Sequence, residues 1–348
     1  MQGSLKRNSL IFFDQRGKFS TTYNFTNTRD VRVYFPDTFP FLFLNNFSGR
    51  SSSPNLQETI VVLSASTFKL LRLPFSIFLS PLYFFALSQV PHIDWNKAVL
   101  VFIILHFLVY PASNGYNSYM DRDTESIGGL EKPPLPSRQL YLTTIVLDIT
   151  AILLGFIVDP VFGLILPLYI GASKAYSYRG IRLKKFPVIG YLTVIIFQGA
   201  LTFWLVYYGS NAENTLWVPW QGMVICALLI GGFYPLTQIY QHQQDLQDGV
   251  VTISYKLGYT GTFIFCAIVY LFAWLFMAQF FIRKDDGDKL LLVSIFFIPV
   301  IVYFIKWFST VRKNNSEANF KNTMKMNWLA SACTNTAFII LLTWKYFE

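Results

Sequence analysis

Long apolar segments recur along most of this chain, and they restrict its possible folds more than any other feature. We predict nine such segments, at residues 66–91, 97–120, 138–158, 160–178, 188–209, 218–241, 260–282, 289–309 and 324–346. A helix of about 20 apolar residues spans the hydrocarbon core of a bilayer, and a helix satisfies its own backbone hydrogen bonds there. The sequence therefore predicts an all-α, polytopic membrane protein with about nine transmembrane helices.

The composition agrees with a membrane protein and argues against a soluble domain or a nucleic-acid-binding protein. Hydrophobic residues make up 53% of the chain and charged residues only 14%, whereas soluble domains contain roughly 25% charged residues. Cys226, Cys266 and Cys333 lie within predicted spans without metal-ligand spacing, which favours a packing role. The net charge of +9 is distributed over separate loops, so we expect no nucleic-acid partner.

The distribution of basic residues predicts the orientation in the bilayer. Lys and Arg are concentrated in the loops after the second, fourth, sixth and eighth spans; the fourth-span loop contains Arg179, Arg182, Lys184 and Lys185. Loops rich in Lys and Arg generally lie on the cytoplasmic side. We therefore expect a multi-pass protein of the inner or plasma membrane with these loops in the cytoplasm.

The chain divides into two regions by composition. Residues 1–58 are rich in Ser, Asn, Arg and Phe without periodicity, and their apolar stretch is too short to span a bilayer. We interpret them as a disordered tail or as residues added by a misplaced start codon. Residues 59–348 are predicted to form one transmembrane domain.

Two polar clusters lie at the ends of apolar segments. The first contains Asn117, Asp121 and Glu125, and the second contains Gln241 and Asp245. Residues four apart share one face of a helix, so each cluster would direct its oxygens the same way. Mg²⁺ prefers hard oxygen ligands and shares them with phosphate. The clusters therefore predict a Mg²⁺–diphosphate site at the cytoplasmic surface, and hence an enzyme acting on a lipid diphosphate.

The positions of the clusters predict an internal repeat. Each cluster follows the second span of a group of four, which divides the domain into two four-helix halves plus one further helix. A transporter with inverted repeats would orient its halves oppositely. Here an even number of spans separates the clusters and places both on one side, which favours an enzyme.

Several motifs, taken together and in order, resemble those of the UbiA-type intramembrane prenyltransferases. They are KLLRLPFSIFLSP, NSYMDRDTE, KPPLPS, YSYRGIRLKKFPVIG and QHQQDLQDGVVTISYKLG, and the similarity extends over roughly residues 66–346. The resemblance implies the nine-helix fold of that family. It also implies transfer of a polyprenyl group from its diphosphate to an aromatic or other lipid-precursor acceptor, with Mg²⁺ assisting departure of the diphosphate.

The resemblance also assigns roles to individual residues. Asn117, Asp121 and Glu125 match the first metal motif, with Glu in place of the usual final Asp. Asp245 matches the last acid of the second motif, and Gln241 stands where Asp is usual, which reduces the negative charge available to Mg²⁺. The implied catalytic residues are Asp121, Asp245 and Arg182. The implied diphosphate-binding residues are Asn117, Lys132, Tyr176, Lys184 and Lys185.

Several alternatives stay open at this stage. If it is not an ordinary prenyltransferase, the protein is a catalytically altered family member, a terpene-cyclase-like enzyme with the same metal site, or a non-enzymatic transporter. The basic loop residues either bind diphosphate or only fix topology. Lys69 and Arg72 either reach the interface or assist diphosphate binding, and Asp148, near mid-span, has either a functional or a structural role. The acceptor is a quinone precursor, another phenol, a tetrapyrrole alcohol or a glycerol phosphate.

Overall fold

The computed structural model describes residues 63–347 and two short segments near the N-terminus. These segments form an antiparallel pair of strands, β1 (Asn8–Phe13) and β2 (Phe19–Phe25). The rest of the predicted N-terminal tail, residues 1–58, lies outside the described residues. The helical unit is considered by itself from here on.

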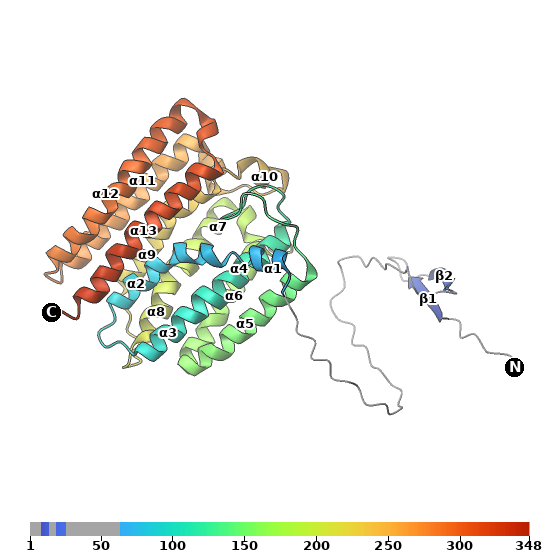
Figure 1. The fold of residues 1–348 in the computed structure, drawn as a ribbon, viewed down its shortest axis with the longest axis horizontal. Coiled ribbons are helices and arrows are strands. Elements are labelled where there is room, and N and C mark those ends of the chain that lie inside the picture. Colours follow the sequence, from blue (N-terminus) through green and yellow to red (C-terminus); the bar gives the residue numbers. More distant parts are fainter. Residues whose placement is uncertain (1–7, 14–18, 26–62, 348) are drawn as a thin grey trace. The chain divides into compact units, whose positions relative to one another are not determined.

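Residues 63–347 are helical apart from short connections (Figure 1). Two elements, η2 and η4, are π-helical segments within longer helices, and η1, η3 and η5 are 3₁₀ turns. The elements in chain order are α1 (Ala65–Leu70), η1 (Leu73–Leu79), α2 (Ser80–Ser88), α3 (Trp95–Ile103), η2 (Ile104–Val109), α4 (Tyr110–Asp121), α5 (Arg138–Val158), α6 (Pro160–Ser177), η3 (Leu183–Lys185), α7 (Pro187–Val194), η4 (Ile195–Leu201), α8 (Thr202–Ser210), α9 (Trp220–Gln238), α10 (His242–Gln247), α11 (Ile253–Ile282), α12 (Gly287–Lys313), η5 (Asn315–Glu317) and α13 (Phe320–Trp344).

Eight helical stretches in the described part of the chain are long and apolar enough to cross a membrane. They correspond to eight of the nine predicted spans. The ninth, predicted at 160–178, forms as the 18-residue helix α6 but does not reach the same apolarity. Three polar residues near its C-terminal end, Ser173, Tyr176 and Ser177, line a cavity, and Lys174 pairs with Asp148. These polar residues make α6 less apolar than the other spans.

Local sequence signals set several helix boundaries. The α5–α6 turn falls at Asp159, whose carboxylate accepts a hydrogen bond from the Val161 amide at 2.7 Å. Pro160 occupies the first turn of α6, where its missing N–H costs nothing. Within α11, Gly258 adopts φ 66°, ψ 178° and separates a short N-terminal turn from the long span. That backbone conformation favours glycine, and it explains the predicted start of this span near residue 260.

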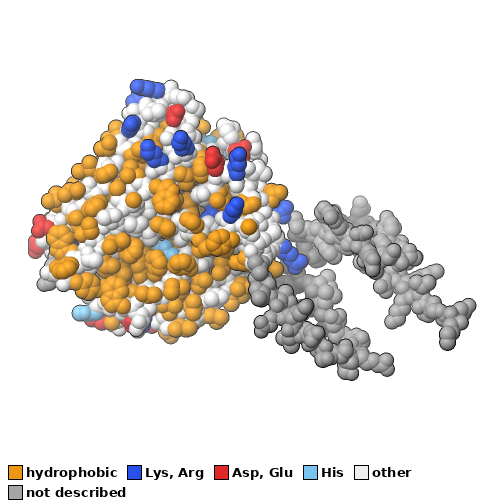
Figure 2. All heavy atoms as spheres, viewed as in Figure 1, with side chains coloured by type: hydrophobic (Ala, Val, Ile, Leu, Met, Phe, Trp, Pro, Cys, Tyr) orange, Lys and Arg blue, Asp and Glu red, His pale blue; other side chains and the backbone are white. Residues whose placement is uncertain are grey.

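The helical unit exposes apolar side chains and buries much of its polar chemistry. On α5, one exposed stripe recurs at spacings of three and four residues and consists of Leu142, Val146, Ile149, Leu153 and Ile157. Figure 2 shows hydrophobic side chains over most of the visible face, with many of the charged groups gathered at its upper end. Soluble monomers rarely expose apolar patches of this extent, so this surface is suited to lipid contact.

The bundle closes between its first and last helices. The helix α13 packs against both α2 and α12, and α11 packs against α9 and α12. The loops after α4, α6 and α9 meet at one end of the bundle: Arg182 contacts Asp248, and the Gln241 amide donates to the Ser126 carbonyl at 3.2 Å. The two polar clusters therefore lie on the same side, as the even number of spans between them predicts.

Candidate functional site

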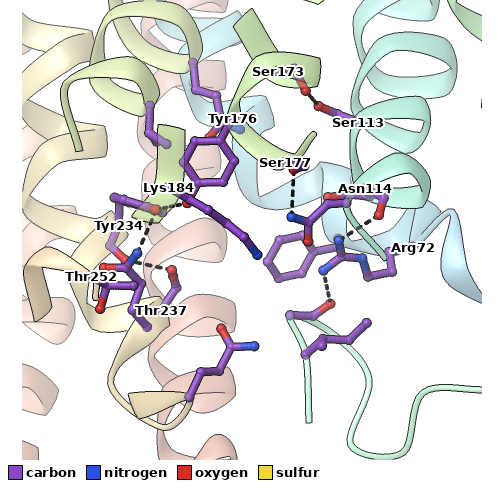
Figure 3. Close-up of a pocket in the computed structure, with 18 of the residues that line it drawn as sticks. Arg72, Ser113, Asn114, Ser173, Tyr176, Ser177, Lys184, Tyr234, Thr237 and Thr252 are labelled. Atoms are coloured by element: carbon purple, nitrogen blue, oxygen red, sulfur yellow. Dashed lines mark hydrogen bonds between the residues drawn. The ribbon is translucent and has the colours of Figure 1, made fainter. Parts of the chain in front are cut away.

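A cavity of about 240 Å³ opens at the end of the bundle where these loops meet. Its lining comes from η1, α4, α6, η3, α7, η4, α9, α10 and α13, so residues far apart in the sequence converge on it. Asn117, Asp121, Gln241 and Asp245 all belong to this lining. Both predicted clusters therefore contribute to one site. In Figure 3 the Lys184 amine projects into the cavity opposite Arg72.

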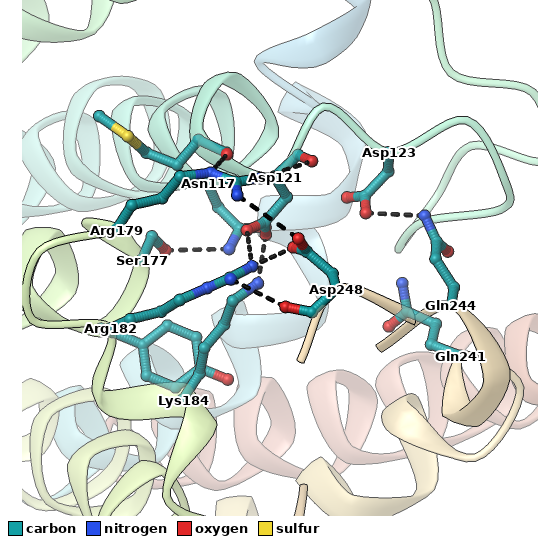
Figure 4. A network of polar contacts seen from close by, with 12 residues as sticks. Asn117, Asp121, Asp123, Ser177, Arg179, Arg182, Lys184, Gln241, Gln244 and Asp248 are labelled. Carbon is teal, nitrogen blue, oxygen red and sulfur yellow. Dashed lines mark hydrogen bonds and ion pairs between the residues drawn. The ribbon is translucent and has the colours of Figure 1, made fainter. Parts of the chain in front are cut away.

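Asp121 lies at the centre of the polar network in Figure 4. It is the last residue of α4 and is only 9% exposed. Its Oδ2 accepts a hydrogen bond from Lys184 Nζ at 2.5 Å, and its Oδ1 lies 3.5 Å from Arg182 Nη2. Oδ1 is nevertheless buried without a hydrogen bond. This oxygen therefore has coordination capacity that the protein alone does not use.

The prediction that Glu125 continues the helix face of Asp121 is wrong. The helix α4 ends at Asp121 because Arg122 adopts a left-handed conformation, with φ 56° and ψ 39°. Glu125 is exposed in the following loop and does not line the cavity. Asp123 does line it, and its Oδ1 accepts a hydrogen bond from Gln244 Nε2 at 2.7 Å. Asp and Ser in this stretch favour loops over helix because their side chains bond nearby backbone.

The second cluster is arranged around the start of α10. Gln241 immediately precedes this helix, and its carbonyl accepts a hydrogen bond from the Asp245 amide at 2.8 Å. Both side chains therefore lie within one turn, as predicted, although on a short separate helix rather than at the end of α9. Burial raises the pKa of Asp245 to about 7; Lys184 opposes this shift, and the carboxylates of Asp121 and Asp123 add to it. A bound cation would relieve this repulsion.

The basic loop after α6 supplies two residues with different positions. Lys184 is buried and lines the cavity. Arg182, also buried, instead bridges two loops: its Nη1 donates to the Asp248 carbonyl at 3.0 Å, and its Nη2 pairs with the Asp248 carboxylate and with Asp121. Arg182 does not line the cavity. The structure thus gives Arg182 a positioning geometry, in contrast to the predicted contact with diphosphate.

The remaining predicted diphosphate-binding residues divide into two groups. Asn117 and Tyr176 line the cavity; Asn117 Nδ2 donates to Ser177 Oγ at 2.9 Å. Lys132 and Lys185 are exposed and do not line it, so the structure does not bring them to the predicted site. Their side chains point away from the cavity, and the sequence of a loop does not specify the direction in which its side chains point.

Tyr176 belongs to a chain of polar side chains on the cavity wall. Its hydroxyl shares a hydrogen bond with the Tyr234 hydroxyl, which also accepts a bond from Gln238 Nε2 at 2.7 Å. Tyr234 is a cavity residue that the sequence did not identify. One tyrosine among many in apolar helices carries no distinguishing pattern.

Three charged residues whose roles the sequence leaves open now have positions. Arg72 is buried in the cavity lining and donates to the Asn114 carbonyl at 3.0 Å and the Gly128 carbonyl at 3.3 Å. Lys69 is exposed and lies outside the lining. Asp148 pairs with Lys174 of α6 at 2.7 Å, away from the cavity lining. This partner favours the structural interpretation of Asp148.

The oxygens of the cavity fit a small divalent cation that is shared with a phosphate ligand. Across the described part of the chain, no three His, Cys, Asp or Glu residues are placed to hold a metal unaided. Mg²⁺, however, is commonly held by one or two carboxylates together with substrate phosphates. Asp121 and Asp245 supply two carboxylates, and the unbonded Oδ1 of Asp121 supplies a free acceptor.

Comparison with known proteins identifies a family and a shared fold. The model of the UbiA prenyltransferase family matches residues 75–329. The chain shares 16% identity with a UbiA homolog from Aeropyrum pernix K1, with a TM-score of 0.61 over 77% of this chain and 98% of that one. It shares 18% identity with a UbiA homolog from Archaeoglobus fulgidus bound to GPP and Mg²⁺, with a TM-score of 0.54 over 79% and 99% of the two chains. No curated protein sequence matches significantly.

These solved structures show a shared fold, and the family match extends over well more than half of the chain. The eight apolar helices in the described part of the chain are consistent with that family's location in membranes. The chain is a multi-pass integral membrane protein that belongs to the UbiA prenyltransferase family.

Proposed function

We propose that this protein transfers a polyprenyl group from its diphosphate to an acceptor, with Mg²⁺ as cofactor. The observation that carries the proposal is the buried carboxylate of Asp121, placed beside Lys184 in a cavity that also contains Asp245. A site in which a fixed cation lies beside carboxylates can hold a metal–diphosphate complex. Support also comes from the related A. fulgidus structure, which was solved with GPP and Mg²⁺.

In this proposal the carboxylates and the lysine of the cavity have separate tasks. Asn117, Asp121, Gln241 and Asp245 would hold Mg²⁺, which neutralises the charge that develops on the departing diphosphate. Lys184 would leave Asp121 and bind diphosphate oxygens directly. Because Lys184 and Asp121 are both buried, their charges interact with each other and with a bound ligand more strongly than they would in water.

The reaction is a substitution at the allylic carbon of the prenyl group. The carbon–oxygen bond breaks, and its electron pair leaves with the diphosphate. A nucleophilic carbon or oxygen of the acceptor forms the new bond and then loses a proton. The aromatic rings of Tyr176 and Tyr234 on the cavity wall would stabilise the positive charge that develops on the prenyl group and help exclude water.

We also propose that the site-bearing loops face the cytoplasm, because Arg179, Arg182, Lys184 and Lys185 lie in one of them. Both the diphosphate and Mg²⁺ would then reach the site from that side.

Acceptor-dependent release of diphosphate tests the proposed activity. The full chain would be reconstituted in liposomes with geranylgeranyl diphosphate and Mg²⁺, with and without a panel of phenols, naphthols and glycerol phosphates. We expect release that requires both Mg²⁺ and one class of acceptor. Release at the same rate without any acceptor would favour a cyclase or lyase, and no release with any panel member would contradict the proposal.

The amide at position 241 leads to a prediction about metal affinity. Gln241→Asp adds a carboxylate to the cavity beside Asp245, so we expect half-maximal activity at a lower Mg²⁺ concentration, by about tenfold. Titration of diphosphate release with Mg²⁺ measures this shift. Gln243→Asp, two residues away in α10 but outside the cavity lining, should leave the midpoint unchanged. An unchanged midpoint in Gln241→Asp would remove residue 241 from the metal site.

The bridging geometry of Arg182 leads to a second prediction. Arg182→Lys keeps the positive charge but removes the fork that joins Asp121 to Asp248. We expect a lower Tm and about a tenfold loss in kcat/KM. Arg179 pairs with Asp248 at 3.4 Å but is half-exposed, so Arg179→Lys should have little effect. Equal effects of the two substitutions on Tm and kcat/KM would contradict the positioning role of Arg182.

A further inference from the structure

A second cavity adjoins the first. It has a volume of about 440 Å³ and is lined mainly by apolar side chains from η1, α2, α9, α11, α12 and α13. Four residues line both cavities: Phe78, Ile230, Phe233 and Asn327. Three of these are apolar, so Asn327 is the polar group at the junction.

Asn327 is buried without hydrogen-bond partners. Its side chain is only 1% exposed, and neither the amide nitrogen nor the amide oxygen has a partner. Leaving a buried polar group unpaired costs about 1–3 kcal/mol. This cost indicates that a ligand with hydrogen-bonding groups pairs with the amide when the junction is occupied.

The neighbouring polar residues of α13 show that Asn327 is exceptional on its own helix. Ser331 and Thr334 also line the second cavity. The Ser331 hydroxyl donates to the Ile77 carbonyl at 3.2 Å, and the Thr334 hydroxyl donates to the Ala330 carbonyl at 2.6 Å. Both hydroxyls are satisfied within the protein, whereas the Asn327 amide faces the junction without such a bond.

We propose that Asn327 is a specificity-determining residue that binds the polar group of the acceptor. The inference rests on the proposed transferase function and names the acceptor class: an apolar body that fits the second cavity, with a hydroxyl or carbonyl at the end nearest the first cavity. A prenyl chain is hydrocarbon and offers no hydrogen bond to the amide. A hydroxylated apolar molecule does, and its polar end would then lie next to the site where the diphosphate departs.

A binding experiment without turnover tests this assignment. The probes are 1-naphthol and naphthalene, which differ by one hydroxyl, and their affinities for the detergent-purified full chain are measured with no prenyl diphosphate present. We expect wild type to prefer 1-naphthol by about tenfold, the effect of one hydrogen bond of about 1.4 kcal/mol. In Asn327→Leu, similar in volume but without the amide, this preference should vanish.

Thr334→Val is the matched control, because Thr334 lines the same cavity but has its hydrogen bond within α13. It should keep the preference for 1-naphthol. Equal affinities of wild type for the two probes, or a preference that persists in Asn327→Leu, would overturn the assignment. Asn327→Ala gives the same comparison if Asn327→Leu does not accumulate. Since no turnover is measured, failure of the transferase assay with the preference intact would refute only the proposed reaction.

A kinetic measurement separates the acceptor from the prenyl donor. With an acceptor found by the diphosphate-release assay, Asn327→Leu should raise the KM of that acceptor about tenfold and leave the KM of geranylgeranyl diphosphate unchanged. A raised KM for geranylgeranyl diphosphate alone would mean that the Asn327 amide serves the diphosphate substrate, and the assignment to the acceptor would be wrong.

Discussion

Asp121→Asn is expected to lower turnover by about 100-fold or more, while the protein remains in the membrane. The substitution keeps the shape of the side chain but removes the charge that pairs with Lys184 and Arg182 and that would hold Mg²⁺. Loss of one preorganised charge-stabilising group in an active site typically costs 10²–10³ in rate. Diphosphate release from reconstituted liposomes, normalised to the folded protein, measures the effect. Asp245→Asn should behave in the same way, because it removes the second carboxylate of the cavity.

Glu125→Gln provides the matched control for this prediction. It also neutralises one acid of the same sequence motif, but Glu125 is exposed and lies outside the cavity lining. We expect its turnover to stay within about twofold of wild type, as for surface substitutions in general. Near-normal turnover in Asp121→Asn, or a large loss in Glu125→Gln, would contradict the position of the metal site.

Lys184→Met is expected to reduce kcat/KM for the prenyl diphosphate by about ten- to a hundredfold. The buried ammonium of Lys184 projects into the cavity (Figure 3), and a charge-assisted hydrogen bond to a phosphate contributes about 1.5–3 kcal/mol. Methionine keeps the length and packing of the side chain, so the loss reports the charge. Initial rates at several diphosphate concentrations give the two kinetic constants.

Lys185→Met removes the same charge from the next residue, whose side chain is exposed and outside the cavity lining. Both variants weaken the positive charge of the loop equally, so an effect through membrane topology would appear in both. We expect only Lys184→Met to lose activity. Equal losses would show that the loop acts through its total charge and not through a lysine in the cavity.

The membrane-spanning helices could be predicted from sequence because their length and apolarity follow from the thickness of the bilayer. The α5–α6 turn was also predictable, since Asp159 is a favourable N-cap residue and Pro160 is favoured in the first turn of a helix. The helix α6 is less apolar than the other predicted spans because it carries Lys174, which pairs with Asp148, and three polar residues that line the cavity.

The arrangement of the site was less predictable because it depends on where helices end and how loops meet. No glycine marks the end of α4; Arg122 adopts the left-handed conformation itself, and this replaces Glu125 by Asp123 in the cavity. The bridge from Arg182 to Asp248 joins loops 66 residues apart. Asn327 carries no pattern in the sequence, because its importance comes only from the absence of partners in the folded bundle.

Mass spectrometry of lipid products tests the central claim most directly. Liposomes containing the full chain would receive Mg²⁺, deuterium-labelled geranylgeranyl diphosphate and the acceptor panel. The account predicts one acceptor-derived product whose mass has increased by the labelled prenyl group less one proton, absent when Mg²⁺ is removed and absent with Asp121→Asn. Labelled prenyl alcohol or a cyclised hydrocarbon as the sole product, with no prenylated acceptor, would contradict it.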